Sequence, residues 1–212
     1  MNPLVVYGCG YSLNELSDGQ WDELRQYDSI GVNWFVFQRW IRPTYMLVGD
    51  IRHDKKEPKV GHTMAEAYEK YVEQAHGECY ENTQFLVRPY QMDSLRGLER
   101  QKVEWEWSIA WCKNCITTAF HWAHLNGYDS VLTVGVDLYD YRYFFLGKEQ
   151  QRMYGMKDDS GWRTKSRVGG KHPALRKFKA WFKGCKTDLK IYCYNPKSLL
   201  LDMPGVELWS SK

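Results

Sequence analysis

The sequence has no apolar run that approaches the roughly 18 to 20 residues needed to cross a bilayer. Its first residues also lack the basic, apolar and small-residue order of a secretion signal. Mean hydropathy is -0.60, and 43% of the 212 residues are hydrophobic, which is typical of a globular protein. We therefore expect one domain over residues 1–212, located in the cytoplasm and without stable membrane association.

Excess charge is also lacking, since the net charge of +3 is too small to require a nucleic-acid partner. Positive charge is nevertheless concentrated late in the chain, over Lys165–Arg167 and then at Lys171, Arg176, Lys177, Lys179 and Lys183. An acidic substrate would be attracted to this cluster, and a solvated helix face is the alternative. We find no internal repeat, linker or low-complexity tract, and the oligomeric state is undefined, so a homo-oligomer is left open.

The six cysteines show no repeated metal-ligand spacing, and Cys112 and Cys115 form the one Cys-x-x-Cys pair. Without a second pair or a His-x-x-x-His, we expect no metal site. His121 and His124 are three residues apart, but the glutamate of a His-Glu-x-x-His motif is absent, so we expect both to be packing residues. No Asp-x-Asp is present to hold a divalent metal against a diphosphate.

The most informative segment present is an apolar strand pattern from Val5 to Tyr7 that runs into Gly8-Cys9-Gly10-Tyr11-Ser12 and then into a helical pattern. Such a turn brings backbone N–H groups close to a phosphate, and the following helix adds partial positive charge. The third glycine of a dinucleotide fingerprint is missing. The segment thus favours a mononucleotide or nucleotide-sugar over NAD, with an ordinary strand-to-helix turn as the alternative.

Strands and helices alternate along the chain, which predicts an α/β fold with a mostly parallel, twisted sheet covered by helices on both faces. Predicted strands are 4–7, 29–33, 45–48, 84–87, 130–135 and 189–194. Predicted helices are 14–27, 63–76, 117–126 and 173–183.

Ligands of such folds bind beyond the carboxyl ends of the strands, so the motifs at strand ends become site candidates. These are Gly8 to Ser12, Asn33, Gly49-Asp50, Gly135 to Tyr139, and Asn195. Residues 147–171 are polar, glycine-containing and without clean periodicity, which predicts a lid loop over the ligand.

Three kinds of side chain are candidates for catalysis or for ligand binding. His172 opens the last predicted helix, where the dipole disfavours its cation and a neutral imidazole can act as a general base. Tyr139, Tyr141 and Tyr143 follow the strand that ends at Gly135, and phenols can donate hydrogen bonds to a departing phosphate without a metal. Asp137 is suited to a ribose hydroxyl or, as the alternative, to capping a turn.

The whole chain resembles the bacterial lipooligosaccharide sialyltransferase family and related short Rossmann-like proteins, over about nine-tenths of its length. The anchors, in order, are 8–13, Asn33, 116–118, 126–139, His172 with 174–175, and 189–200. The resemblance implies a single Rossmann-like domain, a variant of the GT-A type without Asp-x-Asp. It also implies an inverting, single-displacement transfer from a cytidine-monophosphate sugar, with no further cofactor.

The resemblance also implies roles for individual residues. Asn33, Thr117 and Thr118 would hold the donor beside the glycine turn, with Gly135 and Asp137 at the same edge. Tyr139 and either Tyr141 or Tyr143 would stabilise the departing phosphate, and His172 would deprotonate the acceptor hydroxyl.

Two departures from the family pattern change the expected substrate. Cys9 replaces an asparagine beside the nucleotide, and Cys115 replaces an arginine just before Ile116-Thr117-Thr118. A sialic acid carboxylate is less well matched without that cation. We therefore leave the sugar open and expect either a glycan acceptor or a hydroxymethylated pyrimidine in DNA, as with virus-encoded enzymes that glycosylate their own genomes in an infected bacterial cell.

Three other functions stay open at this point. A non-catalytic nucleotide-binding protein would have the same turn but no turnover. A dithiol oxidoreductase would use Cys112 and Cys115 at the start of a helix, where thiol pKa values fall. A phosphotransferase would move diphosphate instead of sugar.

Overall fold

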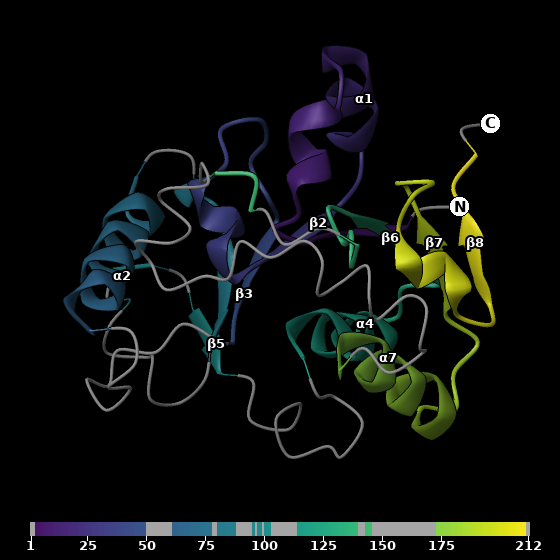
Figure 1. Ribbon diagram of the computed structural model, residues 1–212. Helices are drawn as coiled ribbons and strands as arrows, with labels where there is room; N and C mark the ends of the chain where they lie inside the picture. Colours follow the sequence, from purple (N-terminus) through teal and green to yellow (C-terminus); the bar gives the residue numbers. More distant parts are fainter. Residues whose placement is uncertain are drawn as a thin grey trace.

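The computed structural model describes residues 3–49, 61–77, 80–87, 95, 97–98, 100–102, 114–139, 143–145 and 173–210. In these residues eight strands form one sheet (Figure 1). The strands are β1 (Leu4–Tyr7), β2 (Ser29–Val32), β3 (Tyr45–Val48), β4 (Gln84–Val87), β5 (Arg100–Lys102), β6 (Ser130–Val134), β7 (Lys190–Cys193) and β8 (Val206–Leu208).

The sheet has the order β5-β4-β3-β2-β1-β6-β7-β8, and every neighbouring pair is parallel. The chain leaves β1 toward β2 on one side and returns to β1's other side as β6. The order therefore reverses between β1 and β6, where open α/β sheets place their ligand crevice. The predicted α/β class with a parallel, helix-flanked sheet is confirmed.

Strand residues alternate between two apolar layers because successive side chains point to opposite faces. In β1, Val5 and Tyr7 enter one layer, whereas Leu4 and Val6 enter the other. All four side chains are fully buried. Each contributes roughly 1.5 to 3 kcal/mol relative to exposure, so this four-residue run is enough to specify the central strand.

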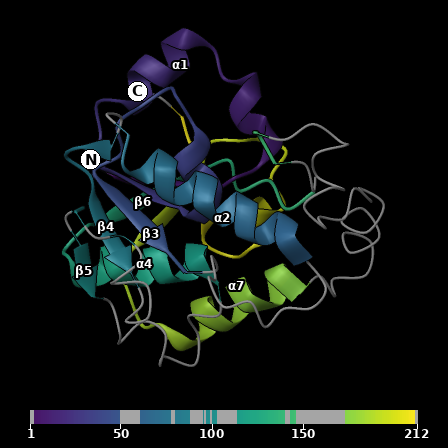
Figure 2. The ribbon, with the colours of Figure 1, turned by 90° about the vertical axis from the view of Figure 1, so that its left-hand side faces the viewer.

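The helices divide between these two layers. The first is covered by α1 (Asp18–Leu24), the 3-10 helix η2 (Asn33–Phe37) and α2 (Gly61–Ala75). The second is covered by α4 (Cys115–Leu125), α7 (Pro173–Gly184) and the 3-10 helix η5 (Leu199–Asp202). Figures 1 and 2 show α1 on one side of the sheet and α4 with α7 on the other. None of the helices in the described ranges is both long and apolar enough to cross a membrane.

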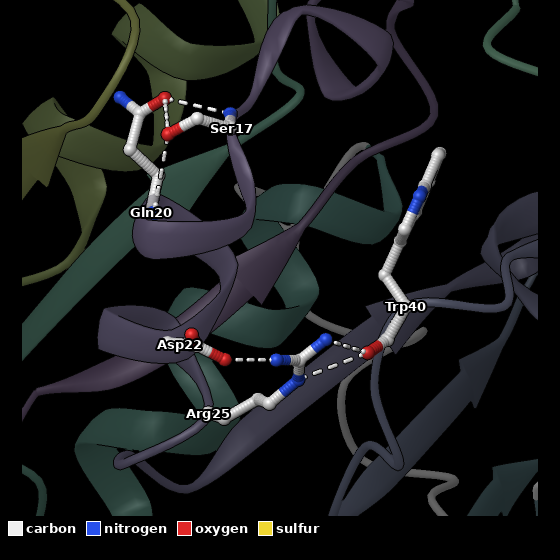
Figure 3. A network of polar contacts seen from close by, with 5 residues as sticks. All are labelled: Ser17, Gln20, Asp22, Arg25 and Trp40. Atoms are coloured by element: carbon white, nitrogen blue, oxygen red, sulfur yellow. Dashed lines mark hydrogen bonds and ion pairs between the residues drawn. The ribbon is translucent and has the colours of Figure 1, made fainter.

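The segment after the glycine turn differs from the prediction of one helix over 14–27. It forms a five-residue 3-10 helix, η1 (Tyr11–Glu15), an extended residue at Leu16, and then α1. Ser17 restarts the helix through a capping box with Gln20, in which each side chain contacts the other residue's backbone (Figure 3). Such a short 3-10 turn has few aligned peptide dipoles, so the expected anion-binding α-helix directly after the turn is wrong.

The end of α1 is tied to the loop before β3. The Arg25 guanidinium donates to the Trp40 carbonyl through Nε at 3.1 Å and Nη2 at 2.8 Å, and it also pairs with Asp22 (Figure 3). The Trp40 ring stacks on Trp21 of α1 with centroids 4.8 Å apart. These contacts fix α1 over the first apolar layer, beside the turn that follows β1.

Candidate functional site

The glycine turn packs directly on the end of β6. Gly8 donates its N–H to the Val134 carbonyl and Gly10 donates to the Gly135 carbonyl, both at 2.8 Å. A Cβ on Gly8 would lie 2.4 Å from the Gly135 oxygen, a distance that side-chain carbons do not tolerate. The glycine at this position is thus required by strand packing, and the N–H groups of Gly8 and Gly10 bond to protein rather than projecting toward a ligand.

Asp137 ties the turn to the end of β6. This buried carboxylate accepts hydrogen bonds from the Ser12 backbone N–H at 3.0 Å and from the Ser12 hydroxyl. The Asp137 carboxylate also lies against Gly10, because a Cβ added to Gly10 would be 2.4 Å from Asp137 Oδ2. Of the two roles expected for Asp137, the structure places it in the capping role.

Asn195, which follows β7, extends this network toward a tyrosine. Its Nδ2 donates to Asp137 Oδ1 at 3.0 Å and to the Tyr139 hydroxyl at 3.2 Å. Asn195 is one of the site candidates at strand ends, although neither that argument nor the resemblance gives it a role. Its position at a strand end was the available signal. The amide now connects the ends of β6 and β7 with the phenol expected to contact the leaving group.

Tyr143 contacts the glycine turn through its backbone. It forms an antiparallel bridge with Gly10, and the next residue, Phe144, donates its N–H to the Cys9 carbonyl at 3.2 Å. Asn14 of η1 adds a bond from Nδ2 to the Phe144 carbonyl at 2.8 Å. Tyr143, about 130 residues from the turn in sequence, therefore lies beside it in space, whereas Tyr139 is connected to the turn through Asn195 and Asp137.

Asn33 joins the ends of β2 and β3 to the start of α4. Its Oδ1 accepts from the Gly49 N–H at 2.8 Å, and its Nδ2 donates to the Cys115 Sγ at 3.2 Å. The Cys9 thiol donates to the Val32 carbonyl at 3.1 Å. The two positions at which the chain departs from the family pattern, Cys9 and Cys115, thus bond to Asn33 or to the residue before it.

Backbone strain is concentrated at the same edge. In the described ranges, the non-glycine residues with positive φ are Asn33 at 46° and Leu138 at 61°. One follows β2 and the other follows β6. Asparagine adopts left-handed backbone more readily than most residues, whereas leucine rarely does, and such strain is often found at binding sites where the surrounding contacts hold it in place.

Thr117 and Thr118 lie in the first turn of α4, with side chains that are fully buried. Both hydroxyls donate to the Asn114 carbonyl at 3.0 Å. Asn114 caps the helix by accepting from the Thr117 N–H at 2.8 Å, which completes a capping box. This cap was not predicted from the sequence. A donor role for the two threonines stays a proposal.

A hollow of about 190 Å³ opens beside the turn, at the carboxyl ends of β6 and β7. Its lining includes Ser12, Gln20, Gly135, Tyr194, Asn195 and Lys197. The Tyr194 hydroxyl donates to Glu23 at 3.1 Å. Burial, together with this bond and the Glu23 charge, raises the pKa of Tyr194 to about 12, so the phenol keeps its proton at neutral pH.

A second hollow of about 260 Å³ lies at the opposite edge, around the amino ends of β6 and β7. His124 and Thr187 are hydrogen-bonded there at 2.9 Å. Although larger, this hollow lies away from the crevice that the strand order defines. Over the described residues, no group of three or more His, Cys, Asp or Glu side chains is placed to hold a metal ion.

The environment of His121, whose ring centroid is 6.0 Å from that of His124, predicts an effect of pH on stability. Burial and the nearby His124 lower the pKa of His121. Below pH 6.5 the unfolded chain therefore binds a proton at this histidine more readily than the folded protein does. The free energy of unfolding should fall as pH decreases. Urea unfolding at pH 5 to 8 measures this. His121→Gln should have a smaller loss between pH 7 and 5 than wild type, and an equal loss would contradict the assignment.

Several predicted residues lie outside the described residues: His172, Tyr141, Asp50, Cys112 and the predicted lid 147–171. The described members of the predicted site are gathered at one edge of the sheet. They are Gly8, Cys9, Gly10, Ser12, Asn33, Thr117, Thr118, Gly135, Asp137, Tyr139 and Tyr143.

Comparisons with known proteins give one similar structure. No protein-family model matches the sequence, and no curated protein matches it. A solved structure of the sialyltransferase CstII from Campylobacter jejuni, in complex with the substrate analogue CMP-3FNeuAc, aligns with 98% of this chain and 86% of that chain. The two share 15% sequence identity, with a TM-score of 0.46. The α/β fold is assigned from the strand order of the sheet.

Proposed function

We propose that the protein is a metal-independent, inverting glycosyltransferase that uses a nucleotide-sugar, with CMP as the nucleotide. The observation that supports this best is the position of Tyr139, whose hydroxyl is bonded to Asn195 beside Asp137, the residue that holds the glycine turn. A phenol donor at this edge of the sheet fits a reaction in which a phosphate must leave without a divalent cation. The absence of Asp-x-Asp from the sequence supports the same choice.

The proposed reaction is a single displacement. The acceptor oxygen attacks the anomeric carbon while the bond from that carbon to the donor phosphate breaks. His172 takes the acceptor proton, and the electron pair of the broken bond leaves on CMP. Tyr139 with Tyr143 or Tyr141 donates to the phosphate oxygens as their charge grows, and Asn195 orients Tyr139.

The donor would lie across the carboxyl ends of β1, β2 and β6. The Gly8 and Gly10 N–H groups bond to the end of β6, and Gly135 and Asp137 fill the space beside the two glycines, so the glycines would shape this edge without contacting the donor themselves. Asn33, Thr117 and Thr118, whose side chains are buried, would support the donor from the α4 side. The acceptor is either a hydroxymethylated pyrimidine in DNA or a glycan.

A panel of CMP-, UDP- and GDP-sugars tests the proposal. We expect CMP-sugars to raise the melting temperature and to be hydrolysed slowly in the presence of EDTA, since no metal is required. Cytidine, which lacks phosphate, is the control and should give a smaller shift. If no nucleotide at millimolar concentration shifts melting, both the donor class and the proposed function are wrong.

A non-catalytic nucleotide-binding protein is the second candidate. It is favoured by the two departures from the family pattern, since Cys9 and Cys115 stand where the family has an asparagine and an arginine. This candidate predicts a melting shift with CMP but neither hydrolysis nor transfer. The same panel therefore separates the two.

A further inference from the structure

Helix α7 has one face in the core and one face in solvent. Leu175, Phe178 and Trp181 are buried, and Phe178 and Trp181 pack on Phe120 of α4 with ring centroids 6.1 and 5.3 Å apart. Figure 2 shows α7 at the outer side of the molecule, beyond α4. The outward face is therefore accessible along the helix.

This outward face is a row of cations. Arg176, Lys179 and Lys183 are exposed and spaced i, i+3 and i+7, so they form one stripe about 10 Å long. Lys177 and Lys186, also exposed, flank the stripe. The helix holds four cations and no acid, more positive charge than the net +3 of the whole chain.

None of these charges is neutralised by a carboxylate in the described part of the chain, where the one ion pair joins Arg25 and Asp22. A stripe of exposed cations on a helix fits a row of negative charges with regular spacing. Phosphates along a nucleic-acid strand supply such a row.

A membrane fits this face less well. Interfacial helices insert an apolar face into the bilayer, but the apolar face of α7 is buried against α4 and the sheet. Over the described residues, the exposed large hydrophobic side chains are Leu125 and Leu208, and neither is on α7. Only electrostatic attraction to a bilayer would remain.

We infer that the outer face of α7 binds the phosphate backbone of a nucleic acid, which makes a polynucleotide the acceptor. That the nucleic acid is the acceptor depends on the proposed function, whereas binding of nucleic acid to α7 does not. The helix begins at Pro173, directly after the proposed base His172, and spans about 18 Å. A strand held along it would lie within that distance of the helix start.

Two double variants with the same change in net charge test the inference. Lys179→Gln with Lys183→Gln removes two charges from the stripe. Arg42→Gln with Lys70→Gln removes two exposed charges elsewhere. Glutamine keeps helix propensity close to that of lysine, so both proteins should fold as wild type does.

Anisotropy of a labelled 20-base-pair duplex, titrated between 50 and 200 mM salt, is the measurement. We expect the α7 variant to bind at least tenfold more weakly and its log–log salt slope to fall by about 1.8, at about 0.9 per lost phosphate contact. The control variant should stay within twofold of wild type.

Equal losses in both variants, or no duplex binding by wild type, would overturn the inference. Wild type that binds vesicles with anionic lipid but not the duplex would also overturn it, in favour of a membrane. Hydrolysis of CMP-sugar by the α7 variant should equal that of wild type. Failure of duplex binding with hydrolysis intact would thus leave the proposed function standing.

Discussion

Gly8→Ala should lower the free energy of unfolding by about 3 kcal/mol, which corresponds to a drop of about 6 to 12 °C in melting temperature. The new methyl carbon would sit 2.4 Å from the Gly135 oxygen and 2.9 Å from its carbonyl carbon. Both are backbone atoms at the central β1–β6 pair, so no side chain can rotate to make room. Relief requires that the turn move away from β6.

Gly19→Ala is the matched control, because nothing lies within 4 Å of the added carbon in α1. The same chemical change should raise stability there by about 0.5 to 1 kcal/mol through the unfolded state. Thermal unfolding of the two variants under one condition tests the pair. Equal melting temperatures would show that the turn is not packed on β6 as described.

His172→Ala should lower the rate of sugar transfer by about 10²- to 10⁴-fold, the usual effect of losing a general base. Tyr139→Phe should also slow transfer, because the phosphate loses a donor while its crevice is unchanged. Affinity for the nucleotide should stay within a few-fold in both variants. Single-turnover transfer and calorimetric titration with CMP measure the two quantities separately.

His76→Ala provides the control for this second prediction, since His76 is exposed just after α2 and away from the carboxyl ends of the strands. It should transfer sugar at the wild-type rate. A His172→Ala protein with full activity would exclude the imidazole as the base. Loss of nucleotide binding in that variant would instead indicate that His172 holds the donor.

The buried strands could be predicted closely, because short buried apolar runs between turns have few other structures open to them. The predictions 29–33, 130–135 and 189–194 extend beyond β2, β6 and β7 by one residue at one or both ends. The predicted bounds of 4–7, 45–48 and 84–87 match β1, β3 and β4. The edge strands β5 and β8 were missed. Arg100–Lys102 has no apolar residue, and Val206–Leu208 is three residues long, so neither has a pattern to detect.

The location of the candidate site stays a prediction, and only some of the contacts among its residues could be predicted from the sequence. Strand ends indicate an edge without the structure, because all parallel strands of one sheet end on the same side. The partners of Asp137 could not be read in this way, since Ser12 is 125 residues away and Asn195 is 58 residues away. Gly8 was predicted from its motif, but the reason for it is packing on Gly135.

Hydrogen–deuterium exchange with and without CMP tests most directly whether the carboxyl edge between β1 and β6 holds the nucleotide. The account predicts slower exchange in peptides that cover 8–13, 33–37 and 135–139. Peptides over 124–130 and 186–190, at the opposite edge, should be unchanged. Protection confined to that opposite edge, or no protection at saturating CMP, would contradict the account.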